Sequence, residues 1–130
     1  MHNAGANGTR LRAEKGINLP DTTLSIPALT AEDKVHLEFI KQHADIVSMS
    51  FVRSASDVED LLQHLQPIDH HCLDIVLKIE TVAAFESLPQ ILLTAMRWDA
   101  VGVMIARGDL AVEAGFDRLG PRRAGNCRAL

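Results

Sequence analysis

Four short apolar runs alternate with amphipathic stretches along this chain of 130 residues, and this alternation strongly constrains its fold. The runs recur at a spacing of roughly 30 residues, which is typical of strand-helix-strand units with parallel strands. These runs are predominantly apolar, as in strands that are covered on both faces. We therefore predict an α/β fold with a parallel sheet, either an open doubly wound sheet or part of a barrel. The expected strands are residues 16–20, 45–52, 73–79 and 99–105.

The stretches between these strands carry signals for helix starts. Thr30 with Asp33 three residues later approximates a capping box, and Ser56 with Glu59 does the same for the next helix. Between the expected strands 73–79 and 99–105, a short helical turn precedes a helix that begins near Ser87. A proline is tolerated in the first turn of this helix. The apolar face expected for the first helix comprises Val35, Leu37, Phe39, Ile40 and Ala44.

Composition and charge exclude several classes of partner. The net charge is -4 at pH 7, aromatic residues make up 4% of the chain, and no stripe of lysine and arginine suggests nucleic-acid binding. The longest apolar runs are far shorter than the roughly 20 residues of a membrane-spanning helix. Cys72 and Cys127 lie far apart, which suits a reducing compartment. We expect a cytoplasmic protein that binds neither nucleic acid nor membranes.

Two strand ends carry the candidate chemistry. Glu80 follows the strand at 73–79, and Asp109 closely follows the strand at 99–105. Neighbouring strands lie about 4.8 Å apart, so these carboxylates could share one hard divalent cation. Lys78 lies two residues before Glu80 and therefore on the same face of its strand. A cation, two carboxylates and a lysine suit a reaction that builds negative charge on oxygen or phosphate.

The same residues allow other interpretations. Lys78 and Glu80 could form a purely structural ion pair at a strand end. The Arg-Gly-Asp tripeptide at 107–109 also occurs in cell-adhesion ligands, but those present it on an exposed extracellular loop, whereas here it follows a buried strand. The His-His-Cys run at 70–72 lacks a fourth metal ligand at a useful spacing, so we interpret it as a solvated loop.

Four strings of residues near the expected strands follow one another in a distinctive order: KGINLP at 15–20, SFVR at 50–53, KIE at 78–80 and MIARGDL at 104–110. In this order and spacing they resemble the catalytic barrel of the pyruvate kinase family, over about residues 9–119. The departures are small and indicate a divergent branch of bacterial type. They are Thr81 where many members have Asn, Ala111 where many have Gly, and Ala114-Gly115 where an Ile-Pro pair is common.

The resemblance implies a fold and a reaction. The family's fold is a (β/α)8 barrel, of which this chain would hold about three and a half strand-helix units. Its enzymes transfer the phosphoryl group of phosphoenolpyruvate to ADP, giving pyruvate and ATP in glycolysis. They use Mg²⁺ or Mn²⁺ and usually K⁺, whose expected site lies mostly outside this chain. Members of the family are usually homo-oligomers.

The resemblance also implies roles for residues that match the family's motifs. Glu80 and Asp109 would bind the divalent cation. Lys78 would be the catalytic residue, neutralising the transferring phosphoryl group and the enolate oxygen. Lys15 and Ser50 would lie near the same mouth of the barrel.

The substrate carboxylate would lie where the last strand ends. The backbone N–H groups of Ala106, Arg107 and Gly108 lead toward a short helix expected after Asp109, and helix starts bind anions. Together with Lys78 and Asp109, this segment would bind the substrate. The Arg107 side chain itself is expected to form a structural ion pair.

The chain divides into three parts by this interpretation. Residues 1–9 are expected to be a flexible lead-in, 10–119 a partial barrel domain, and 120–130 an irregular basic tail, which a frame shift near Gly120 would explain. An unclosed barrel leaves two sheet edges unpaired. We therefore expect the isolated chain to lack turnover and to self-associate. The alternatives are a Mg²⁺-dependent aldolase or lyase of the related phosphoenolpyruvate/pyruvate barrels, and a non-catalytic interaction fragment.

Overall fold

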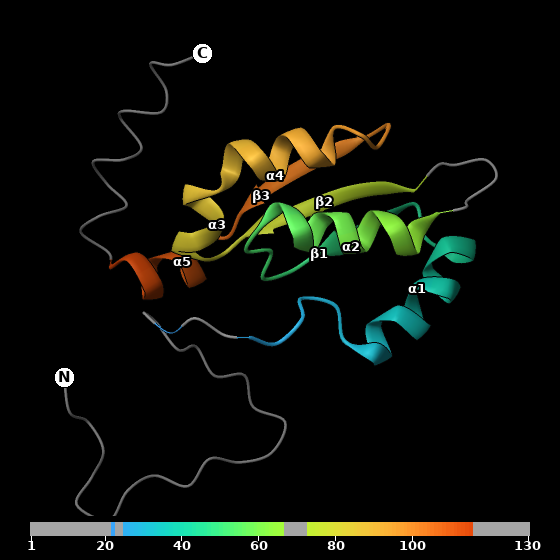
Figure 1. The fold of residues 1–130 in the computed structure, drawn as a ribbon, viewed down its shortest axis with the longest axis horizontal. Coiled ribbons are helices and arrows are strands. Elements are labelled where there is room, and N and C mark those ends of the chain that lie inside the picture. The colour runs from blue at the N-terminus through green and yellow to red at the C-terminus, as the bar shows by residue number, and fades with distance from the viewer. Residues whose placement is uncertain (1–21, 23–24, 67–72, 116–130) are drawn as a thin grey trace, which may run out of the picture.

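The computed structural model describes residues 22, 25–66 and 73–115, and the structural statements below refer to these residues. Helices and strands alternate through them as the sequence predicts (Figure 1). The predicted strand at 16–20 and the ends of the chain lie outside the described residues. The elements are α1 (Ala31–His43), β1 (Ile46–Met49), α2 (Ala55–Leu65), β2 (Asp74–Ile79), α3 (Val82–Glu86), α4 (Leu88–Ala95), β3 (Val101–Ile105) and α5 (Arg107–Ala114).

The three strands form one parallel sheet in the order β1-β2-β3. Strand order follows chain order without a reversal, so crossovers of the usual right hand place their helices on the same face of the sheet. Figure 1 shows α2 and α4 together on one face. A doubly wound sheet reverses its strand order to cover both faces. The described topology is therefore that of a partial α/β barrel, as predicted.

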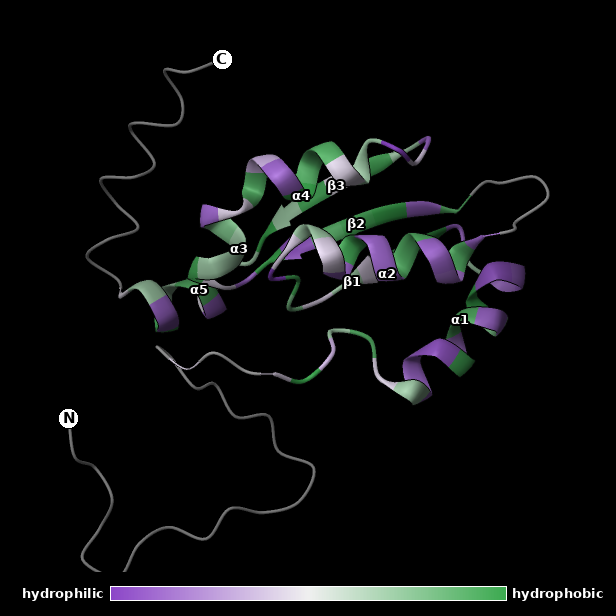
Figure 2. Cartoon of the chain, viewed as in Figure 1, coloured by the Kyte–Doolittle hydropathy of each residue, from purple (hydrophilic) through white to green (hydrophobic). Residues whose placement is uncertain are grey.

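The expectation that both sheet faces are covered is wrong for the described residues. Along β2, Ile75, Leu77 and Ile79 are buried, whereas Val76 and Lys78 between them are only half-buried. Barrel helices lie outside the sheet, and side chains of all the strands together fill the interior. The half-buried face of this three-stranded sheet corresponds to that interior. Figure 2 shows that β2 and β3 are nevertheless largely hydrophobic.

The core lies between the sheet and helices α2 and α4. Trp98 packs against this core, and its indole N–H donates to the Leu73 carbonyl at 2.8 Å. The broad apolar face predicted for α1 is wrong in part, because Leu37 is buried but Val35 and Phe39 are exposed. The largest fully buried apolar side chains of the core are Leu61, Leu65, Ile75, Leu77, Ile79 and Ile91.

Several predicted element boundaries are wrong, and β3, for example, begins at Val101 and not at residue 99. Helix α2 begins at Ala55, and Ser54 rather than Ser56 is its N-cap. Its first turn is fixed by Asp57, whose Oδ2 accepts the Ser54 N–H at 3.0 Å. Strand β1 ends at Met49, three residues before its predicted end.

The predicted start of α1 is confirmed. Thr30 is the N-cap, and its hydroxyl and N–H both donate to Asp33 Oδ2, at 2.7 and 2.8 Å. These hydrogen bonds hold the pKa of Asp33 below its usual value, because they favour the ionised carboxylate. None of the described helices is both long enough and apolar enough to cross a membrane.

Candidate functional site

The ends of β1 and β2 bring Lys78, Glu80 and Ser50 together. The Lys78 ammonium lies 2.6 Å from Glu80 Oε1 and donates to Ser50 Oγ at 2.8 Å. Lys78 and Glu80 meet because they lie two residues apart on one strand face, as predicted. Ser50 joins them because β1 runs parallel to β2, with Met49 paired to Leu77.

Glu80 is the charged residue at the centre of this cluster. It is 2% exposed, and burying a carboxylate is costly unless each oxygen is paired. Lys78 pairs with Oε1, and the Phe51 N–H donates to Oε2 at 2.7 Å. Each carboxylate oxygen can accept about two hydrogen bonds or ligands. Glu80 therefore retains acceptor capacity on both oxygens.

The Phe51 backbone contact was not predicted from the sequence. Phe51 has φ of 53°, in the left-handed region that residues with a Cβ rarely adopt. This conformation occurs just after β1 ends and accompanies the N–H contact with Glu80. Phe51 belongs to the SFVR string, but an aromatic residue at this position does not predict a left-handed backbone.

Helix α5 begins at the neighbouring strand end. It starts at Arg107, so Asp109 lies in its first turn, and the prediction that the helix follows Asp109 is wrong. Ala106 is the N-cap and offers no side-chain acceptor to the first N–H groups. A Cβ added at Gly108 would meet no atom of the described residues within 4 Å, so there is open space beside this glycine in that part of the chain. Asp109 is exposed.

Two hydrogen bonds connect α5 to the end of β2. The Ala106 N–H donates to the Ile79 carbonyl at 3.1 Å, which continues the β2–β3 ladder into the helix start. The Val82 N–H, at the start of α3, donates to Glu113 Oε2 at 2.9 Å. Val82 follows Glu80 by two residues. Hydrogen bonds therefore connect the segment that carries Glu80 with the helix that carries Asp109.

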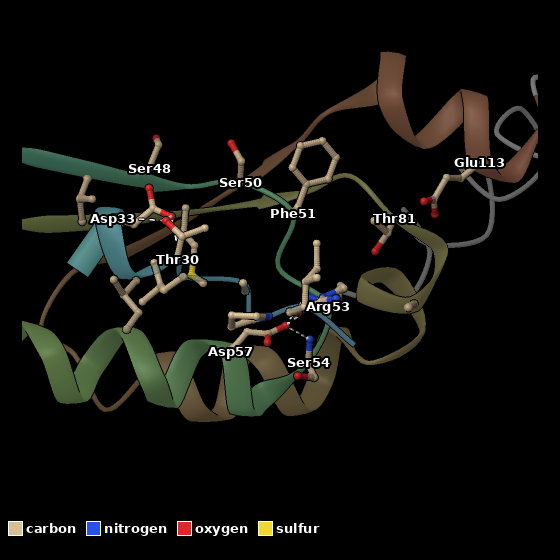
Figure 3. Close-up of a pocket in the computed structure, with 18 of the residues that line it drawn as sticks. Thr30, Asp33, Ser48, Ser50, Phe51, Arg53, Ser54, Asp57, Thr81 and Glu113 are labelled. Atoms are coloured by element: carbon tan, nitrogen blue, oxygen red, sulfur yellow. Dashed lines mark hydrogen bonds and ion pairs between the residues drawn. The ribbon is translucent and has the colours of Figure 1, made fainter. Parts of the chain in front are cut away.

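A cavity of about 1210 Å³ borders this cluster, between the segment before α1, strand β1, and helices α1, α3 and α5 (Figure 3). Ser50, Phe51, Thr81 and Glu113 contribute to its wall. Lys78, Glu80 and Asp109 do not line it. This cavity therefore lies beside the charged cluster and is not centred on it.

The structure describes most of the predicted site residues, but not all of them. Lys78, Glu80 and Ser50 are in contact, and Ala106, Arg107, Gly108 and Asp109 form the adjacent helix start. Within the described ranges Arg107 shows no ion pair. Lys15 and the His-His-Cys run at 70–72 lie outside the described residues.

The donor chemistry of this site fits a hard divalent cation. No group of three or more His, Cys, Asp or Glu side chains gathers anywhere in the described part of the chain. Glu80 and Asp109 offer carboxylate oxygens, and Mg²⁺ commonly takes one or two carboxylates with water or substrate oxygens. The donor types of Glu80, just after β2, and Asp109, in the first turn of α5, therefore match those that such an ion takes.

Comparison with known proteins identifies similar sequences over most of the chain. The family model described as pyruvate kinase, barrel domain, matches residues 1–121. A pyruvate kinase of Hypocrea jecorina is 37% identical over 108 residues, which cover 82% of this chain and 19% of that protein. A pyruvate kinase of Geobacillus stearothermophilus is 37% identical over 82% of this chain and 18% of its own length. Human pyruvate kinase PKLR is 39% identical over 82% of this chain and 18% of its own length. The chain spans about a fifth of the length of these curated relatives.

The burial of Glu80 predicts strong coupling with Lys78. In a double-mutant cycle of Lys78→Met and Glu80→Gln, we expect a coupling free energy of about 1–3 kcal/mol, because Lys78→Met alone leaves a buried carboxylate short of one partner. Urea denaturation of the four proteins measures it.

An exposed ion pair supplies the matched control. Arg97 and Glu59 lie 3.1 Å apart, with side chains 62% and 50% exposed. For Arg97→Met and Glu59→Gln we expect coupling of less than about 0.5 kcal/mol. Equal coupling in the two cycles would contradict the importance of Glu80 burial.

Proposed function

The chain belongs to the pyruvate kinase family, and from this premise we propose that it carries the phosphoenolpyruvate side of a phosphoryl-transfer site. The reaction would move the phosphoryl group of phosphoenolpyruvate to ADP, giving pyruvate and ATP. The observation that carries the proposal is the Lys78 ammonium, fixed between Ser50 and the buried Glu80 at the strand ends. Barrel enzymes place their active sites at this edge of the sheet.

Lys78 has one N–H group left for a substrate oxygen. An ammonium has three donors, and Ser50 Oγ and Glu80 Oε1 take two of them. The third would donate to the transferring phosphoryl group or to the enolate oxygen. Phosphoryl transfer depends mainly on positioning and charge neutralisation. A lysine held by two fixed partners supplies both.

Glu80 and Asp109 would hold Mg²⁺ or Mn²⁺. When bound, the ion would supply positive charge to substrate oxygens that become more negative during transfer. Glu80 has acceptor capacity left on both oxygens, and Asp109 is exposed at the adjoining helix start. We further propose that K⁺, if used, is bound mostly by parts of the protein outside this chain.

The first turn of α5 would bind the substrate carboxylate. The Ala106 N–H, which was expected to take part, already donates to the Ile79 carbonyl. The N–H groups of Arg107, Gly108 and Asp109 lack intrahelical partners by their position in the helix. The positive end of the helix dipole favours an anion there. Because no side chain caps this turn from Ala106 and there is open space beside Gly108 among the described residues, a carboxylate could approach the backbone closely.

The proposed role belongs to glycolysis in the cytosol. The isolated chain spans about a fifth of its relatives, so we propose that turnover needs the strands and nucleotide contacts of a complete barrel. A test of the chemistry should therefore place these residues in such a barrel.

Grafting residues 10–119 in place of the matched segment of the Geobacillus stearothermophilus relative provides that test. We expect the chimera to form ATP from phosphoenolpyruvate and ADP in a coupled lactate dehydrogenase assay. Lys78→Met in the chimera should lower kcat by about 10²-fold or more, because it removes fixed positive charge at the reacting oxygens. Lys34→Met, at a partly exposed helix position, is the control and should leave kcat within about twofold.

Two outcomes would contradict this proposal. A folded chimera that cleaves oxaloacetate but forms no ATP would favour the aldolase or lyase alternative. Full activity of the Lys78→Met chimera would exclude Lys78 from catalysis.

We also propose that the isolated chain self-associates through the uncovered side of its sheet. β3 pairs only with β2 in the described sheet, and Met104 on the half-buried face is 51% exposed. Edge strands with exposed apolar side chains pair readily with other chains. Light scattering after size-exclusion chromatography should therefore give a mass above that of one chain.

Met104→Glu should shift this association toward monomer, because it places a charge on the exposed face. Met96→Glu adds the same charge at the exposed C-cap of α4, outside the strands, and should leave the association unchanged. A monomeric unsubstituted chain at micromolar concentration would contradict this interpretation.

A further inference from the structure

We propose that Glu113 is a positioning residue that fixes Asp109 relative to Glu80. No motif in the sequence assigns Glu113 a role, and this residue belongs to neither the lysine cluster nor the first turn of α5. The inference deepens the proposed function and rests on it, because it concerns the geometry of the same two carboxylates.

A long-range hydrogen bond connects α5 to the start of α3. The Val82 N–H donates to Glu113 Oε2 at 2.9 Å across a sequence separation of 31 residues. Val82 is the first residue of α3, so its N–H has no partner within that helix. Glu113 supplies an acceptor that the helix cannot provide itself. In Figure 3, Thr81 and Glu113 lie on facing segments at one end of the cavity.

Both ends of this hydrogen bond lie close in sequence to a proposed cation ligand. Val82 follows Glu80 by two residues, and Glu113 follows Asp109 by four on the same helix. Residues four apart share one helix face, about 5–6 Å between Cβ atoms. The contact therefore restrains rotation of α5, which is the motion that would carry Asp109 away from Glu80.

Other contacts restrain α5 together with Glu113. The Ala106 N–H bond to the Ile79 carbonyl fixes where α5 starts, but a single bond at the N-cap acts as a pivot. Leu110 and Ala111 are buried and hold one side of the helix against its neighbours. Thr81 is occupied in α3, since its Oγ1 accepts the Ala84 N–H at 3.1 Å.

Variants at Glu113 test this with Mn²⁺ as the probe. Titration followed by electron paramagnetic resonance of free Mn²⁺ gives the dissociation constant. We expect Glu113→Ala to weaken binding about tenfold, as loss of groups that orient metal ligands commonly does. Glu113→Gln keeps an oxygen that can accept the Val82 N–H, and should stay within about threefold of the unsubstituted chain.

A matched control separates position from charge. Glu86 is an exposed carboxylate of α3 that lines the same cavity, and it has no hydrogen bond or ion pair among the described residues. Glu86→Ala removes one negative charge, as Glu113→Ala does. Because a single exposed charge acts weakly, Glu86→Ala should leave the Mn²⁺ dissociation constant within about threefold of that of the unsubstituted chain.

Amide exchange of Val82 gives a readout that needs no metal. Glu113→Ala should speed exchange at Val82 about fivefold or more, because a hydrogen bond is lost, whereas Glu113→Gln should preserve most of the protection. Circular dichroism confirms that each variant is folded.

The outcomes distinguish this inference from the proposed function. Unchanged Mn²⁺ affinity in Glu113→Ala, with Glu80→Gln still weakening it, would overturn the inference alone. Equal losses in Glu113→Gln and Glu113→Ala would overturn it too, since Glu113 would then act by its charge. Absence of Mn²⁺ binding by the unsubstituted chain would overturn the proposed cation site and this inference together.

Discussion

The buried carboxylate of Glu80 is the constraint on which the rest of the candidate site depends. A charge with 2% exposure must be paired on both oxygens, and the chain does this with Lys78 of β2 and with the backbone N–H of Phe51, in the turn that follows β1. The first pairing fixes the Lys78 ammonium beside Ser50. The second accompanies a left-handed Phe51 just after β1 ends. A strained backbone of this kind persists only where its surroundings hold it.

The unreversed strand order gives this carboxylate its neighbours. Because β1, β2 and β3 run parallel and side by side, the turns that follow them all lie at one edge of the sheet (Figure 1). Ser50, Glu80 and Ala106 each occupy the first position after a strand or close to it. Because this strand order does not reverse, helices cover only one face of the described sheet. The site therefore opens toward the uncovered face, where Lys78 is paired in register with Met104.

Much of this arrangement could be predicted from the sequence, and the remainder depends on backbone geometry. Period-2 alternation places Lys78 and Glu80 on one face, and parallel pairing brings Ser50 to them. The capping signal at Thr30 is confirmed, but Ser54 and Ser56 are both acceptable caps, and only the path of the turn after β1 selects Ser54. A continuous apolar run does not distinguish a barrel interior from a helix-covered face, so the coverage of the sheet was wrongly predicted. The Glu113 contact spans 31 residues and leaves no local signal.

The central claim is that a cation site lies at the C-terminal ends of β2 and β3. Paramagnetic broadening of backbone amide signals by substoichiometric Mn²⁺ tests it most directly, since broadening falls steeply with distance from the ion. The account predicts that the strongest broadening occurs at Phe51, at residues 80–82 and at 107–110, and that Glu80→Gln reduces it. The opposite ends of the strands, where Asp74 and Asp99 also offer carboxylates, should stay sharp. Broadening centred at those ends, or spread evenly over exposed acidic residues, would contradict the account.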